Sequence, residues 1–101
     1  MRAEERWFKQ AQRDLHNAKK IFEIGLYDVC LFLCQQSVEK ALKALYVKAR
    51  KEPPPRVHSL ERIIRLLELG EEFRELTLDL EDYYFTMRYP DVTAFRSKSV
   101  V

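Results

Sequence analysis

Apolar residues recur every three or four positions along four segments of this 101-residue chain, a spacing that gathers them on one side of a helix. The predicted helices span residues 2–24, 27–51, 60–69 and 71–88. Their ends carry suitable residues, because Gly25 and Gly70 favour a helix C-terminus and Ser59 is a good N-cap. We therefore predict an all-α fold in which residues 1–101 form one domain, an antiparallel, up-and-down four-helix bundle.

The first two predicted helices each carry an apolar stripe that we assign to the core. The stripe of the first contains Trp7, Phe8, Ala11, Leu15, Ala18, Ile21 and Phe22, and that of the second contains Tyr27, Leu31, Cys34, Val38, Ala41, Leu42 and Leu45. Residues 29–34 are apolar on all sides, and a helix of that kind is covered on more than one side. We expect this extra cover to come from a second copy or a partner, through the predicted interface residues Val29, Phe32, Leu33 and Val47.

Composition narrows the class of protein. The formal net charge of +2 is typical of neither a nucleic-acid-coating protein nor a membrane-surface binder. No apolar run approaches the ~20 residues of a membrane span, and no signal-type apolar region follows the charged start. We therefore predict a cytoplasmic protein. The three consecutive prolines of Pro53–Pro55 predict a stiff, extended connector after the second helix.

Gln36, Lys40 and Lys43 form the first candidate site. Their spacing places them on one face of the second helix, which we predict to lie opposite its core stripe. Apolar residues flank this face, and polar groups ringed by apolar ones suggest a recognition surface. The alternative interpretation is a solvent-exposed face that carries an ion pair between Glu39 and Lys43.

Two further candidates lie near helix ends. His58 precedes the predicted N-cap and could act as an acid–base group or simply form a local hydrogen bond. Arg88, Tyr89 and Asp91 follow the fourth helix, where Arg88 could bind a phosphate or a base and Tyr89 could stack on it. The alternative is that Arg88 and Asp91 pair with each other and fasten the helix end.

Conventional catalytic and metal-binding motifs are absent from the sequence. With only 2 Gly, the chain has no phosphate-binding loop, and no pair of histidines has the spacing of metal ligands. Cys30 and Cys34 lie four residues apart on one predicted helix, a geometry that is poor for a disulfide, and we expect two small buried apolar side chains. We therefore predict no metal, no cofactor and no catalytic residue.

Four blocks of the sequence resemble those of the HEPN domain family. They are Asp14-Leu15 with Ala18, the stretch Gln35–Leu45, the triplet His58-Ser59-Leu60, and Tyr84 followed by Arg88-Tyr89-Pro90-Asp91. Their order and spacing carry the resemblance together. It implies a helical bundle that commonly forms a homodimer. It also implies frequent pairing with a minimal nucleotidyltransferase, often as a toxin–antitoxin pair, and binding of nucleotides.

Several branches of the family that the chain resembles are metal-independent ribonucleases. They use an arginine followed, after four to six residues, by a histidine, contributed by both copies across a dimer. Counted from Arg88, the histidine would fall at position 93, 94 or 95, and these positions hold Thr93, Ala94 and Phe95. Seven residues separate Arg50 from His58, one more than the motif allows. Family members usually continue into another helix, whereas this chain ends ten residues after Asp91, so we expect the final fifth helix to be lacking.

Three functional hypotheses follow. The first is a binding or accessory module, a homodimer that accepts a nucleotide or a partner nucleotidyltransferase. Its polar contacts would come from Gln36, Lys40, Lys43, His58, Arg88, Tyr89 and Asp91. The second is a ribonuclease toxin, which the missing motif disfavours, so we expect no enzymatic activity. The third is a purely structural dimerisation domain.

Overall fold

A computed structural model describes the backbone of residues 1–88 and the side chains of residues 1–83. It contains α1 (Ala3–Glu23), α2 (Tyr27–Arg50), α3 (Leu60–Leu67) and α4 (Glu71–Arg88), and no strand within the residues described. The predicted all-α helical bundle is confirmed, and the bounds of α1, α2 and α4 agree with the predicted ones to within a residue at each end. In this part of the chain, none of the helices combines the length and the apolar character that crossing a membrane requires.

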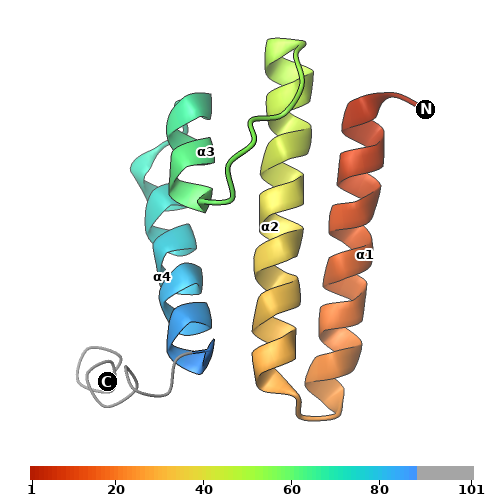
Figure 1. Ribbon diagram of the computed structural model, residues 1–101, viewed down its shortest axis with the longest axis vertical. Helices are drawn as coiled ribbons and strands as arrows, with labels where there is room; N and C mark the ends of the chain where they lie inside the picture. Colours follow the sequence, from red (N-terminus) through yellow and green to blue (C-terminus); the bar gives the residue numbers. More distant parts are fainter. Residues whose placement is uncertain (89–101) are drawn as a thin grey trace.

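The helices form an open row in which α2 occupies the middle (Figure 1). α1 packs antiparallel to α2 after a tight turn at Gly25, whose φ of +82° suits a residue without a Cβ. α3 and α4 pack on the other side of α2 and on each other, and within the described residues α1 touches neither of them. One side of the α1–α2 pair therefore has no third helix above it.

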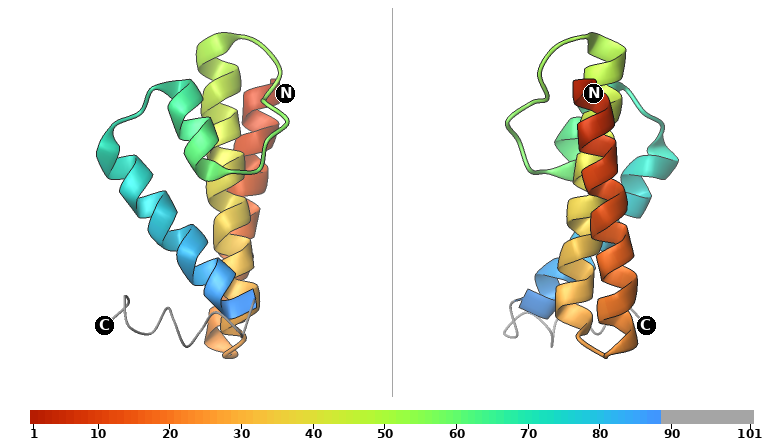
Figure 2. Two further views of the ribbon diagram at one scale, coloured as in Figure 1. Left: turned by 60° about the vertical axis from the view of Figure 1, so that its left-hand side comes forward. Right: turned by 90° about the vertical axis from the view of Figure 1, so that its right-hand side faces the viewer.

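The connector between α2 and α3, residues 51–59, reverses the chain without helical structure. It begins at Lys51, which takes a left-handed conformation with φ of +59° and donates its N–H to the carbonyl of Val47. It then runs back along the bundle, so that α3 has the direction of α2 and α4 runs antiparallel to both (Figure 2). The up-and-down order thus holds for α1–α2 and for α3–α4, whereas the connector makes α2 and α3 parallel.

Both ends of α3 have identifiable caps. The hydroxyl of Ser59 accepts the N–H of Arg62 at 3.4 Å, which confirms the predicted N-cap. The C-terminal prediction is wrong, because the helix ends at Leu67 and not at Leu69. Glu68, with φ of +56°, takes the left-handed position that we assigned to Gly70, and its N–H and that of the following residue return to the last turn, as in a Schellman motif.

The core of the protomer is centred on α3. Leu60, Ile63 and Ile64 are almost completely buried, and small residues close the seam between α1 and α2: Ala11, Ala18 and Ala44. Many side chains that we predicted to be in the core are exposed to solvent. Five members of the two predicted stripes are between 43% and 60% exposed: Phe8, Leu15, Phe22, Tyr27 and Leu45. Assigning those positions to the protomer core was therefore wrong, because α3 and α4 cover α2 from a different direction.

We expect Ile63→Ala to lower the free energy of unfolding by about 2–5 kcal/mol, because it opens a cavity at a fully buried position. The matched control is Leu66→Ala on the same helix, where the side chain is 45% exposed and the loss should stay below about 1 kcal/mol. Urea denaturation followed by circular dichroism measures both. Equal losses would contradict the placement of the core.

Candidate functional site

Charged side chains from α1, α2 and the connector form two sets of ion pairs on α2, Asp14–Lys40 and Lys43–Glu39–His58. We call these five residues together the charge cluster. Asp14 lies on α1, His58 lies on the connector, and the other three lie on α2 at spacings that share one side of a helix. Two of the candidate ligand-binding residues, Lys43 and His58, therefore share the partner Glu39, whereas Lys40 pairs separately with Asp14.

Lys43 is held inside the protein. Its ammonium lies 3.0 Å from Oε2 of Glu39, and both side chains are at most 7% exposed. The same ammonium sits 5.5 Å from the centre of the Trp7 ring, within range of a cation–π interaction. The prediction that this face of α2 lies opposite the core is wrong for Lys43, and the ion pair with Glu39 that we expected in solvent is buried.

Lys40 joins α2 to α1. Its ammonium lies 2.8 Å from Oδ2 of Asp14, a carboxylate that is almost buried, while the Lys40 side chain keeps 24% of its surface exposed. One turn away, the hydroxyl of Ser37 donates to the carbonyl of Ala11 at 2.7 Å. Polar contacts therefore fix the register of the two helices where the apolar side chains between them are too small to do so.

His58 is the exposed member of the charge cluster. Its Nδ1 lies 3.1 Å from the same Glu39 oxygen that accepts from Lys43, and 86% of its side chain is exposed. A carboxylate can only accept a hydrogen bond, so in the neutral imidazole Nδ1 carries the proton and the lone pair of Nε2 points away from Glu39. A histidine oriented in this way can accept a proton or a hydrogen bond from a ligand at Nε2.

The other candidate residues are placed less completely. Gln36 is half-buried on α2. Arg88 is the last residue of α4, at the helix end that comes close to the first half of α2, and the contacts of its side chain fall outside the described residues (Figure 2). Tyr89 and Asp91 also lie outside the described residues, so the predicted Arg88–Asp91 pair stays a prediction.

Of the predicted partner-interface residues, Val29 and Phe32 are 40% and 43% exposed, and Leu33 is half-buried. Val47 is buried and lines a hollow with Ala3 of the same chain, so it presents little surface. The role of these residues in an interface remains a prediction.

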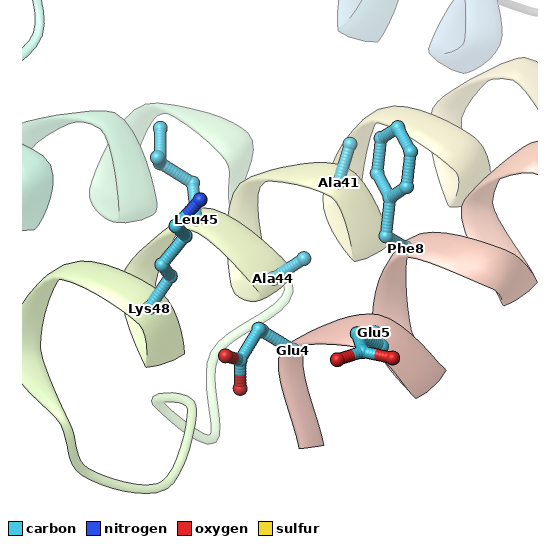
Figure 3. A pocket seen from close by; sticks show the side chains of 7 residues that line it. All are labelled: Glu4, Glu5, Phe8, Ala41, Ala44, Leu45 and Lys48. Carbon is cyan, nitrogen blue, oxygen red and sulfur yellow. The ribbon is translucent and has the colours of Figure 1, made fainter. Parts of the chain in front are cut away.

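A second surface lies on the side of α1 and α2 that no third helix covers. We call it the apolar face, formed by Phe8, Leu15, Ala18, Phe22, Cys30, Cys34, Ala41, Ala44 and Leu45. Two grooves cross it between the helices. The first encloses about 360 Å³ near the start of α1, where Glu4, Glu5 and Lys48 stand at its end (Figure 3). The second encloses about 370 Å³ near the α1–α2 turn, where Lys19 and Glu23 stand at its edge.

The two cysteines line the second groove as free thiols. They are half-buried, less than the sequence led us to expect. Burial raises the pKa of the Cys34 thiol, and the neighbouring Cys30 raises it further. The thiol of Cys34 therefore stays protonated and weakly nucleophilic at neutral pH. Among the residues described, no three His, Cys, Asp or Glu side chains gather as a metal site would require.

Sequence reasoning missed Asp14 as a member of the charge cluster and Trp7 as a contact of Lys43, and it found only one of the two partners of Glu39. The pair Glu39–Lys43 was visible from its four-residue spacing. The contacts of Asp14 and of His58 join residues that are distant in the sequence, and no local signal reports them.

We expect Glu39→Gln to lower the free energy of unfolding by about 3–5 kcal/mol, because it leaves the ammonium of Lys43 buried without its counter-charge. Adding Lys43→Met to this variant should recover most of the loss, since it removes the buried charge. The control, Glu61→Gln, breaks pairs with the exposed Arg65 and Arg74 and should cost about 1 kcal/mol or less. A double variant less stable than Glu39→Gln would contradict the argument.

The comparison with known protein families agrees with the resemblance seen in the sequence. The family model of the HEPN domain matches residues 4–101, nearly the whole chain. No curated protein and no solved structure matches this chain. With four helices and a family model that covers almost all of its length, the chain belongs to the HEPN domain family.

Proposed function

We propose that this HEPN chain is an accessory module that acts by binding other proteins, as a homodimer and as the companion of a minimal nucleotidyltransferase in a toxin–antitoxin-type pair. One observation carries the proposal. The large apolar side chains of α1 and α2 point outward, whereas the charges of Glu39 and Lys43 are buried between the elements. This distribution suits a surface that another polypeptide covers.

The free energy available from covering the apolar face supports a protein as its binding partner. Fully burying a Leu or Phe side chain contributes roughly 1.5–3 kcal/mol, and the apolar face exposes several such side chains at about half of their surface. Single soluble chains seldom leave a contiguous apolar patch of more than a few hundred Å² in water unless it binds something. Most of the charged residues that line its grooves are themselves exposed, so their charged groups can stay in water when a partner covers the apolar side chains.

Nucleotide binding is the second candidate function, favoured by the charge cluster. The side chain of His58 is exposed, and that of Lys40 keeps 24% of its surface exposed. Of the basic side chains in the cluster, these two are open to a phosphate group, because Lys43 is buried. Because Asp14 already neutralises Lys40 at 2.8 Å, an anion has to compete with that carboxylate, so we expect weak binding in the millimolar range. We do not propose ribonuclease activity, because the motif that would support it is missing from the sequence.

We expect the protein to be a dimer at micromolar concentration and Leu15→Lys to convert it to a monomer, because the change places a charge in the centre of the apolar face. The control is Gln10→Lys, which adds the same charge at an exposed position on the same helix that lines neither groove. Light scattering after size exclusion measures the mass, and circular dichroism checks the helices. A wild-type monomer would contradict the homodimer.

We expect ATP or GTP at millimolar concentration to raise the melting temperature, since a ligand at ten times its Kd stabilises the folded state by about 1.4 kcal/mol. Lys40→Gln should abolish the shift. Asp14→Asn should enlarge it, because it releases the Lys40 ammonium for the phosphate. Each shift is measured against the same variant without nucleotide. Wild-type protein that melts at one temperature in all nucleotides would end the nucleotide proposal and leave the protein-binding one in place.

A further inference from the structure

The two grooves of the apolar face are nearly equivalent. They enclose about 360 and 370 Å³, and they lie on opposite sides of the level at which Ser37 of α2 donates its hydroxyl to Ala11 of α1. Each is lined by one aromatic side chain, several small side chains and charged residues of both signs. Two similar halves arranged about one level are what a two-fold symmetric contact uses, because the same patch then serves both partners.

The residues of α1 repeat this arrangement. Phe8 and Leu15 lie equally far along the helix from a point between Ala11 and Gln12, one in each groove. Glu5 and Lys19 lie equally far along the helix from Gln12, seven residues on each side. When two copies of α1 pack antiparallel about that point, each Phe8 meets the partner's Leu15 and each Glu5 stands opposite the partner's Lys19. A parallel pairing of the same helices would instead bring Glu5 against the partner's Glu5.

The residues of α2 share the same centre. Ala41 and Cys34 lie equally far from a point between Ser37 and Val38, and so do Leu45 and Cys30. Antiparallel pairing therefore sets Leu45 against the partner's Cys30 and Ala41 against the partner's Cys34, so each contact on α2 includes a small side chain and the helices can approach closely. Because the Ser37–Ala11 hydrogen bond holds the two centres at one height, a single axis serves both helices.

We propose that the apolar face binds a second copy of this chain, α1 on α1 and α2 on α2, antiparallel about a two-fold axis that crosses the helices at the level of Ala11 and Ser37. The two α1–α2 hairpins together form a four-helix bundle whose seam is the pair of grooves. The nucleotidyltransferase of the proposed function then has to use another surface. This inference rests on the proposed homodimer and adds its surface and register.

Disulfide cross-linking tests the register. In a Cys30→Ser background, Ala41→Cys should form disulfides with the partner's Cys34 and give a covalent dimer of twice the 12.1 kDa chain mass as the main product. Residues 34 and 41 are about 10 Å apart along one helix, so they cannot bridge within a chain. Copper phenanthroline supplies the oxidant, because the Cys34 thiol is mostly protonated. The controls are Cys30→Ser alone and Cys30→Ser with Ala49→Cys, and both should stay monomeric on a non-reducing gel.

The charge pair gives a second readout that needs no cysteine. Glu5→Lys and Lys19→Glu should each weaken the dimer, by up to about fivefold in Kd for each pair lost, and the double variant should restore it. A double variant that dimerises no better than either single variant would contradict the antiparallel register.

The proposed homodimer and its proposed register can be contradicted separately. Suppose that the protein is dimeric by light scattering but that the Ala41→Cys variant forms no more covalent dimer than the Ala49→Cys control. That result overturns this register and leaves the homodimer in place. A protein that is monomeric by light scattering overturns the homodimer and the register together.

Discussion

The carboxylate of Glu39 is the group on which the arrangement of this protein depends. It is buried in the middle of α2, it neutralises the equally buried Lys43, and it anchors the connector by accepting from His58. A buried charge left unpaired would cost several kcal/mol, so α2 has to present this side to covering chain. The connector therefore runs back over α2, and it delivers α3 to the position where Glu81 of α4 accepts the N–H of Leu60 at 2.8 Å.

Turning the charged side of α2 inward leaves the apolar side outward. α1 covers only one flank, and its contact with α2 is built from alanines and from the Asp14–Lys40 pair. α3 supplies the largest buried side chains, but it is a short helix, and within the described residues neither it nor α4 reaches α1. The protomer thus has a small core and a large open apolar face, a combination that accounts for the proposal of a binding module better than any single residue does.

The sequence predicted the helices well because local signals determine them. Apolar spacing located all four, Gly25 ended the first, and Ser59 capped the third. Periodicity tells which residues share a side of a helix, but it does not tell which side faces the protein interior. The stripe with Tyr27 and Leu45 was therefore assigned to the core and proved exposed. The partners of Asp14 and His58 depend on how distant segments meet, and the predicted pairing of Arg88 with Asp91 lies outside the described residues.

The peripheral place of α1 has a consequence for how the chain opens. A helix with a single neighbour can detach as a unit, at a free-energy cost lower than that of global unfolding, and its amides then exchange with solvent early. Yet this same helix contributes half of the apolar face. Any polypeptide that occupies the face binds only the state in which α1 is docked, so occupancy and local order are thermodynamically linked. The rigidity of α1 is then set by how much partner is present and not by the sequence alone.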